Sequence, residues 1–148
     1  MDRLLLLVVV ATAAGTLAHL VQRRQPDAPV RTGWSVPQQL DRRDFDRPDA
    51  PWLVAVFTSA RCETCSSVVE VAGPLESEAV AFHEVEAGAR KDLHDRYAVE
   101  AVPMVLLVDA VGVVRSHHLG PVSATHLWGS LAELRQPGCT PDGCSAGD

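Results

Sequence analysis

Residues 52–65 read WLVAVFTSARCETC, and this stretch decides the fold. Its first six residues are apolar without interruption, as in a strand that is buried on both faces of a sheet. Cys62 and Cys65 follow after a short gap, at the start of a segment that can be helical as far as Ala72. The stretch therefore predicts a strand, a turn, and a Cys-x-x-Cys pair at the beginning of a helix.

The spacing of the two cysteines has a chemical consequence. Two intervening residues bring the sulfurs about one helical turn apart, so a small disulfide ring can close and reopen. The first sulfur would lie at the helix N-terminus, where unpaired N–H groups and the helix dipole favour a thiolate. A thiolate is the species that attacks a disulfide, so we interpret the pair as a redox dithiol in which Cys62 attacks and Cys65 resolves. A static disulfide or half of a metal site is the alternative interpretation.

The rest of the chain predicts alternating strands and helices. Residues 80–86 predict a strand and residues 90–97 a helix. Pro103 then opens an apolar strand that continues to Val108, and a turn containing Gly112 leads into a last strand over 113–119. Gly120 follows, and an amphipathic helix is expected over 123–134. The order gives an α/β domain with a mixed central sheet and helices on both faces.

These features together resemble the thioredoxin family over roughly residues 36–134. The resemblance is carried by the cysteine pair, by Val102-Pro103, by the hairpin with Gly112 at its turn and by Gly120 before the last helix. It implies a thioredoxin fold and disulfide exchange with protein thiols, with no organic cofactor and no metal. It also implies that the Val102–Pro103 peptide is cis, and that these two residues bind an extended substrate segment by strand addition.

The sequence also departs from the family pattern. Thioredoxins carry Trp-Cys-Gly-Pro-Cys where this chain has Arg-Cys-Glu-Thr-Cys, and Arg61 favours a thiolate at Cys62 while Glu63 opposes it. The buried Asp of the family falls at Val56 and an aromatic residue falls at Thr58, so a proton acceptor for the second thiol is missing. This favours the alternative that the chain is a thioredoxin-fold binding or scaffold domain with structural or regulatory cysteines.

Composition excludes some other functions. The chain has 148 residues, a length that predicts one domain, and its net charge is −6. No basic patch with interleaved aromatic residues is present in the sequence, so nucleic acid is not an expected partner. His117 and His118 would point to opposite faces of a strand and cannot share a metal ion. A solvated acidic face is expected from Glu76, Glu78, Glu84 and Glu86.

The first 21 residues predict a transmembrane anchor. Residues 4–21 carry no formal charge, and as a helix they would span about 27 Å, close to the ~30 Å hydrocarbon core of a bilayer. A cleavable signal peptide, cut near Ala13, is the alternative. Arg23, Arg24 and Arg31 follow the span, and the positive-inside rule then favours a domain that faces the cytoplasm. The exported side, which the resemblance to membrane-tethered thioredoxin-like proteins favours, is the alternative. The expected localisation is a single-pass membrane protein.

A linker and a tail flank the predicted domain. Residues 22–35 are a polar linker, 36–135 are the thioredoxin-like domain, and 136–148 are an irregular tail. Cys139 and Cys144 in the tail are a candidate secondary dithiol that exchanges with the first pair. A tail disulfide, free thiols and metal binding, including a four-cysteine zinc site, are the alternatives. The expected partners are protein thiols or disulfides, a redox partner, and the membrane through the N-terminal helix.

Overall fold

The computed structural model describes residues 33–138. The predicted anchor, most of the predicted linker, and Cys139 and Cys144 lie outside the described residues. In chain order the elements are η1 (Arg42–Asp44), β1 (Trp52–Thr58), α2 (Cys65–Ala72), η2 (Gly73–Leu75), β2 (Val80–Glu86), α3 (Lys91–Arg96), β3 (Met104–Asp109), β4 (Val114–Leu119) and α4 (Ala124–Arg135).

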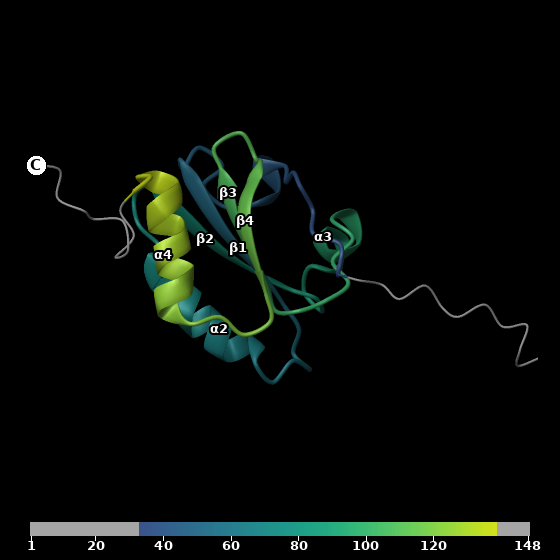
Figure 1. The fold of residues 1–148 in the computed structure, drawn as a ribbon. Coiled ribbons are helices and arrows are strands. Elements are labelled where there is room, and N and C mark those ends of the chain that lie inside the picture. The colour runs from purple at the N-terminus through teal and green to yellow at the C-terminus, as the bar shows by residue number, and fades with distance from the viewer. Residues whose placement is uncertain (1–32, 139–148) are drawn as a thin grey trace, which may run out of the picture. The chain divides into compact units, whose positions relative to one another are not determined.

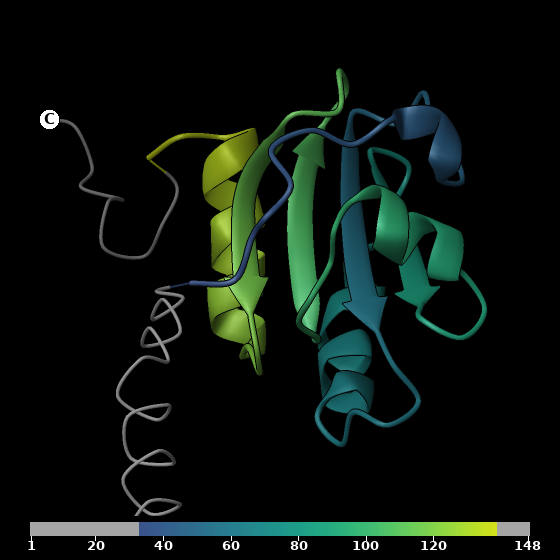
Figure 2. The same cartoon turned by 90° about the vertical axis from the view of Figure 1, so that its right-hand side faces the viewer.

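The strands form one mixed sheet in the order β2-β1-β3-β4 (Figure 2). The apolar strand β1 is central, parallel to β2 and antiparallel to β3, and β4 is antiparallel to β3. Val56 of β1 is opposite Glu84 of β2, and Phe57 is opposite Met104 of β3. The predicted α/β class with a mixed central sheet is confirmed, and the strand predicted over 80–86 is observed with those bounds as β2.

Alternation along β1 divides the core between the two faces of the sheet. Val54 and Val56 pack on one face with Val68 of α2 and Leu127 of α4. Ala55 and Phe57 point to the other face, where they pack with Leu93 of α3 and Phe45. Figure 1 shows α2 and α4 together on one side of the sheet and α3 on the other. Helices cover both faces, as predicted.

The segment before η1, residues 36–40, lies against the β3–β4 hairpin without forming a regular strand. It forms only an isolated bridge from Gln39 to Val113, supported by bonds from Leu40 N–H to the Gly112 carbonyl at 2.8 Å and from Val114 N–H to the Gln38 carbonyl at 3.0 Å. Pro37 has no N–H to donate, so a continuous ladder cannot extend through it.

The β3–β4 hairpin is held against this segment. Gly112 at the turn has φ +88°, and a Cβ built on it would lie 2.1 Å from the Leu40 carbonyl oxygen. The Asp109 carboxylate accepts the N–H groups of Val111 and Val113 at 3.0 and 2.9 Å. Only glycine fits at residue 112, because the turn needs both a positive φ and a close approach of two backbones.

The predicted localisation is corrected. Residues 33–138 contain no helix with the length and apolar character needed to cross a membrane. The segment on which the prediction of a membrane-anchored, cytoplasm-facing domain rested, residues 4–21, lies outside the described residues.

Candidate active site

The cysteine pair lies between the end of β1 and the start of α2. Cys62 and Cys65 are joined by a disulfide with an S–S distance of 2.12 Å and a Cα–Cα distance of 5.4 Å. The helix begins at Cys65, three residues later than predicted, after a turn in which Cys62 N–H donates to the Ser59 carbonyl at 3.0 Å. Cys62 therefore precedes the helix, and Cys65 is its first residue rather than one turn inside it.

The two sulfurs differ in exposure. Cys62 is half-buried, while Cys65 is only 4% exposed. Cys65 lies on the same face of α2 as the buried residues Val68 and Ala72, three and seven positions further on, so it faces the sheet. This difference agrees with the expected roles, in which the more accessible Cys62 attacks and the buried Cys65 resolves.

Glu86 at the end of β2 fastens the loop that carries the cysteines. One carboxylate oxygen accepts the N–H of Ala60 at 3.0 Å, and the other accepts the N–H groups of Gly88 and Ala89 at 2.8 and 2.9 Å. These bonds, that from Ala60 first, hold the pKa of the Glu86 carboxyl below its ordinary value. Glu86 is thus a structural carboxylate, not part of a merely solvated acidic face as the sequence predicted.

Glu84 lies two residues earlier on the same face of β2 and is bound differently. The hydroxyl of Thr58, which is 2% exposed, donates to one Glu84 oxygen at 2.8 Å. The other oxygen makes no hydrogen bond to any described residue. Thr58, Glu84, Glu86 and both cysteines line one hollow of about 400 Å³. Glu84 is exposed, as the prediction of a solvated face expected, and its carboxylate also shares a hollow with the dithiol, which that prediction did not include.

The Val102–Pro103 peptide is cis, as predicted. It lies directly before β3, and the pairing of Phe57 with Met104 puts the end of β1 and the start of β3 side by side. The loop with the cysteines leaves from that end of β1. The backbone N–H and carbonyl of Val102 make no hydrogen bond within residues 33–138.

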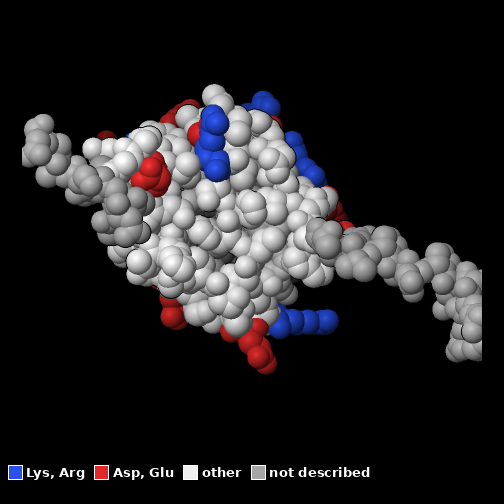
Figure 3. Space-filling model, viewed as in Figure 1, with Lys and Arg blue, Asp and Glu red and all other residues white. Residues whose placement is uncertain are grey.

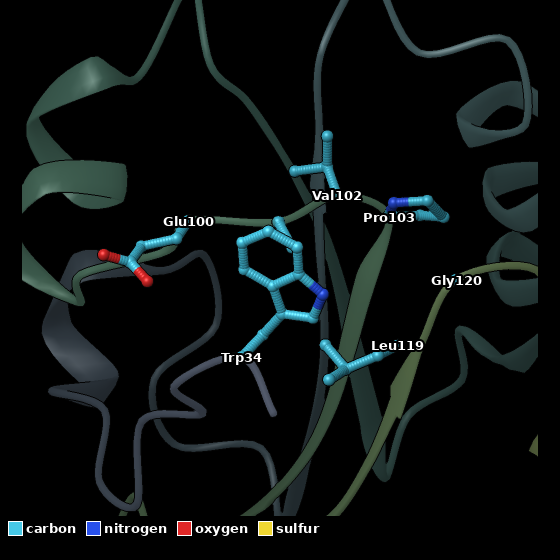
Figure 4. Close-up of a pocket in the computed structure, with 7 residues that line it drawn as sticks. Trp34, Glu100, Val102, Pro103, Leu119 and Gly120 are labelled. Carbon is cyan, nitrogen blue, oxygen red and sulfur yellow. The ribbon is translucent and has the colours of Figure 1, made fainter. Parts of the chain in front are cut away.

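A second hollow, of about 600 Å³, lies next to the cis peptide (Figure 4). The Trp34 ring lies between Glu100 and Leu119 in this view, beside Val102. Trp34 and Leu119 are 56% and 37% exposed, and Val111 and Trp128 are the other exposed large apolar residues in the described part of the chain. Few charged side chains occupy the centre of the face seen in Figure 3. An apolar surface thus adjoins the candidate substrate-binding residues.

The remaining sequence candidates do not join the site. His117 is exposed and His118 half-buried on alternate faces of β4, as predicted. Among residues 33–138 no three potential metal-binding side chains come together. The zinc alternative with Cys139 and Cys144 concerns residues outside those described.

Comparison with solved structures decides the fold. A variant thioredoxin from Halobacterium salinarum NRC-1 is 19% identical, over 68% of this chain and 95% of its own, with a TM-score of 0.54. Thioredoxin f from spinach chloroplasts, in its short form, is 14% identical over 70% of this chain and 100% of its own, with a TM-score of 0.52. The chain has the thioredoxin fold.

The resemblance to thioredoxins read from the sequence is thereby confirmed at the level of the fold. A malarial protein is also similar, at 16% identity over 58% of this chain and 98% of its own, with a TM-score of 0.51. No protein-family model matches the sequence, and no curated protein matches it significantly. Likeness at 14–19% identity shows the fold alone.

Proposed function

We propose that the chain is a thiol-disulfide oxidoreductase acting on protein thiols and disulfides. The observation that carries the proposal is the Cys62–Cys65 disulfide at the start of α2 in a thioredoxin fold, with the cis Val102–Pro103 peptide directly before β3, the strand paired with β1. A disulfide with a half-buried first sulfur is accessible to an incoming thiolate, whereas a purely structural bridge gains nothing from exposure.

In the reducing direction the dithiol acts in two steps. The Cys62 thiolate attacks one sulfur of a substrate disulfide, forms a mixed disulfide and releases the other substrate sulfur as a thiolate. Cys65 then loses its proton and attacks the Cys62 sulfur. The intramolecular disulfide forms, the second substrate sulfur leaves, and the substrate has gained the two electrons that the dithiol lost. The oxidising direction is the reverse.

The substrate would bind as an extended segment along Val102. Its backbone would pair with the N–H and carbonyl of Val102, which have no partner among residues 33–138, as in strand addition. Pro103 removes one donor and closes that end of the ladder. The apolar surface of Trp34 and Leu119 would take a side chain of the same segment.

Reduction of insulin by the full chain with a dithiol reductant tests the proposal against the scaffold alternative. The expected result is catalysed precipitation of the insulin B chain, which Cys62→Ser abolishes. Because Cys139 and Cys144 are a candidate second dithiol, the assay is repeated with both replaced by Ser, and activity that depends on Cys62 should remain. No catalysis by the folded chain would support a scaffold or binding role instead.

A further inference from the structure

Cys65 needs a proton acceptor that the family pattern does not supply here. Its thiol is 4% exposed, and burial in apolar surroundings disfavours the thiolate that must form before it attacks. Val56 occupies the position at which thioredoxins carry a buried Asp. It is fully buried and packs with Val68 of α2, so it offers no acceptor.

The strand next to Val56 supplies a carboxylate. Glu84 is the register partner of Val56 in the parallel pair of β1 and β2. Val80 and Phe82 pack in the core under α2 and α4, and alternation places Glu84 on this same face of β2. Cys65 faces the sheet from α2, and Glu84 and Cys65 line the same hollow. A carboxylate therefore stands on the side of the sheet from which the thiol must lose its proton.

The bonding of Glu84 suits a proton acceptor, and that of Glu86 does not. Glu86 has both oxygens occupied by three backbone N–H groups, so protonation would release the loop it holds. Glu84 has one oxygen fixed by the Thr58 hydroxyl, and the other makes no bond within the described residues. One bond orients the carboxylate and leaves an oxygen available for a proton.

We propose that Glu84, oriented by Thr58, accepts the proton of Cys65 when the mixed disulfide on Cys62 is resolved. The inference rests on the proposed function. The Cys65 S–H bond breaks, its proton moves to a Glu84 oxygen, and the thiolate attacks the Cys62 sulfur. The bond from Cys62 to the substrate sulfur breaks, and the substrate sulfur leaves as a thiolate. Glu84 then gives its proton to that thiolate or to water, which returns the carboxylate to its charged form.

The direction in which Glu84→Gln changes the rate of resolution distinguishes a proton acceptor from a fixed negative charge. The charged groups at the hollow are Glu84 and Glu86 on β2 and Glu63 in the loop, and Arg61 precedes Cys62 in the chain. If Glu84 acted only as a fixed negative charge, Glu84→Gln would favour thiolates and speed resolution. If Glu84 takes the proton, Glu84→Gln slows resolution.

The test follows the two attacks separately in the full chain with Cys139 and Cys144 replaced by Ser. The reduced protein is mixed with a symmetrical nitroaromatic disulfide whose leaving thiolate is coloured. The first burst of colour reports attack by Cys62, and the second reports resolution by Cys65. Glu84→Gln should slow the second phase about 10-fold or more at pH 6, and change the first by less than about twofold. The difference should shrink as the pH rises above the ordinary thiol pKa of about 8.5, because hydroxide can then remove the proton of Cys65 in place of Glu84.

Two further variants sharpen the result. Thr58→Val keeps the shape of the buried side chain but removes the hydroxyl that orients Glu84, and it should slow the second phase by a smaller factor. Glu78→Gln makes the same chemical change before the other end of β2 and should leave both phases unchanged. A second phase that is unaltered or faster in Glu84→Gln would overturn the proposal. If the parent chain itself shows no second phase, the proposed oxidoreductase function fails instead.

Discussion

The two ends of the central sheet use their polar groups differently. At the hairpin end, Asp109 accepts two turn N–H groups with one oxygen and Arg115 at 2.6 Å with the other, while buried Arg42 donates to its carbonyl at 2.8 Å. At the dithiol end, the Val102 backbone and one oxygen of Glu84 have no hydrogen-bond partner among the described residues. At the hairpin end the polar groups named here are hydrogen-bonded within the fold. At the dithiol end some polar groups have no such bond and are available to another molecule.

Replacement of the cysteines should give the largest effect on function. Cys62→Ser should abolish disulfide exchange with an insulin substrate, because the remaining sulfur of the pair, that of Cys65, is only 4% exposed and cannot reach a protein disulfide. In Cys65→Ser, Cys62 should still attack the substrate disulfide, but no second sulfur of the pair remains to resolve the mixed disulfide within the protein. Non-reducing gels of the full chain, with Cys139 and Cys144 also replaced, would show accumulated mixed disulfides only for Cys65→Ser. Accumulation in Cys62→Ser would reverse the two roles.

Gly112→Ala should damage the hairpin end without touching the chemistry. The added Cβ would meet the Leu40 carbonyl at 2.1 Å on a backbone with φ +88°, and we expect a loss of unfolding free energy of about 3 kcal/mol. Denaturant unfolding measures the loss. The reaction rate per folded molecule should stay unchanged, and a fall in that rate would show that the two ends are coupled.

Glu86→Gln should change the pH dependence of the stability of the fold. The pKa of Glu86 in the fold lies below its ordinary value of 4.5, mainly through the bond from Ala60 N–H. Ionised Glu86 therefore stabilises the fold fully above pH ~4.5, and this contribution is lost as the pH falls through the lowered pKa. At pH 7 the parent should have a higher melting temperature than Glu86→Gln, and near pH 2 the two melting temperatures should be the same. Equal separation at both values would contradict this account of the carboxylate.

Substitutions in the apolar surface should have the smallest effect. Trp34→Ala or Leu119→Ser should raise KM for a protein disulfide about fivefold with little change in kcat, because the substrate segment loses an apolar contact. A small soluble disulfide should react as before. Val111→Ser is the matched control, since Val111 is 70% exposed at the hairpin turn. An equal effect of Val111→Ser would remove the link between this surface and the substrate.

Much of the fold could be predicted from local patterns. Continuous apolar residues over 52–57 predicted the central strand, because a strand covered on both faces has no polar alternation. The start of α2 was predicted three residues too early, since the turn at residues 59–62 depends on bonds from outside the segment. One of these joins Ala60 N–H to Glu86, 26 residues away.

The dithiol and the cis peptide could be predicted for a different reason. Each is a short motif whose chemistry is complete within a few residues, and the resemblance to thioredoxins supplied their place in the fold. Glu84 offered no such signal. A glutamate on a strand has the same local appearance whether or not a cysteine pair shares its hollow. Glu84 is exposed, as predicted, whereas Glu86 is bound by three backbone N–H groups and is not merely solvated.

The sequence by itself determined the order of strands and helices, the division of the core between two faces, and the identity of the redox pair. These follow from side-chain periodicity and from the spacing of two sulfurs. Only the tertiary structure brought Glu84 to Thr58, fastened the dithiol loop to Glu86 and placed Trp34 beside Val102. Such contacts join residues far apart in the chain, and they depend on which strands pair and in what register, which no local pattern specifies.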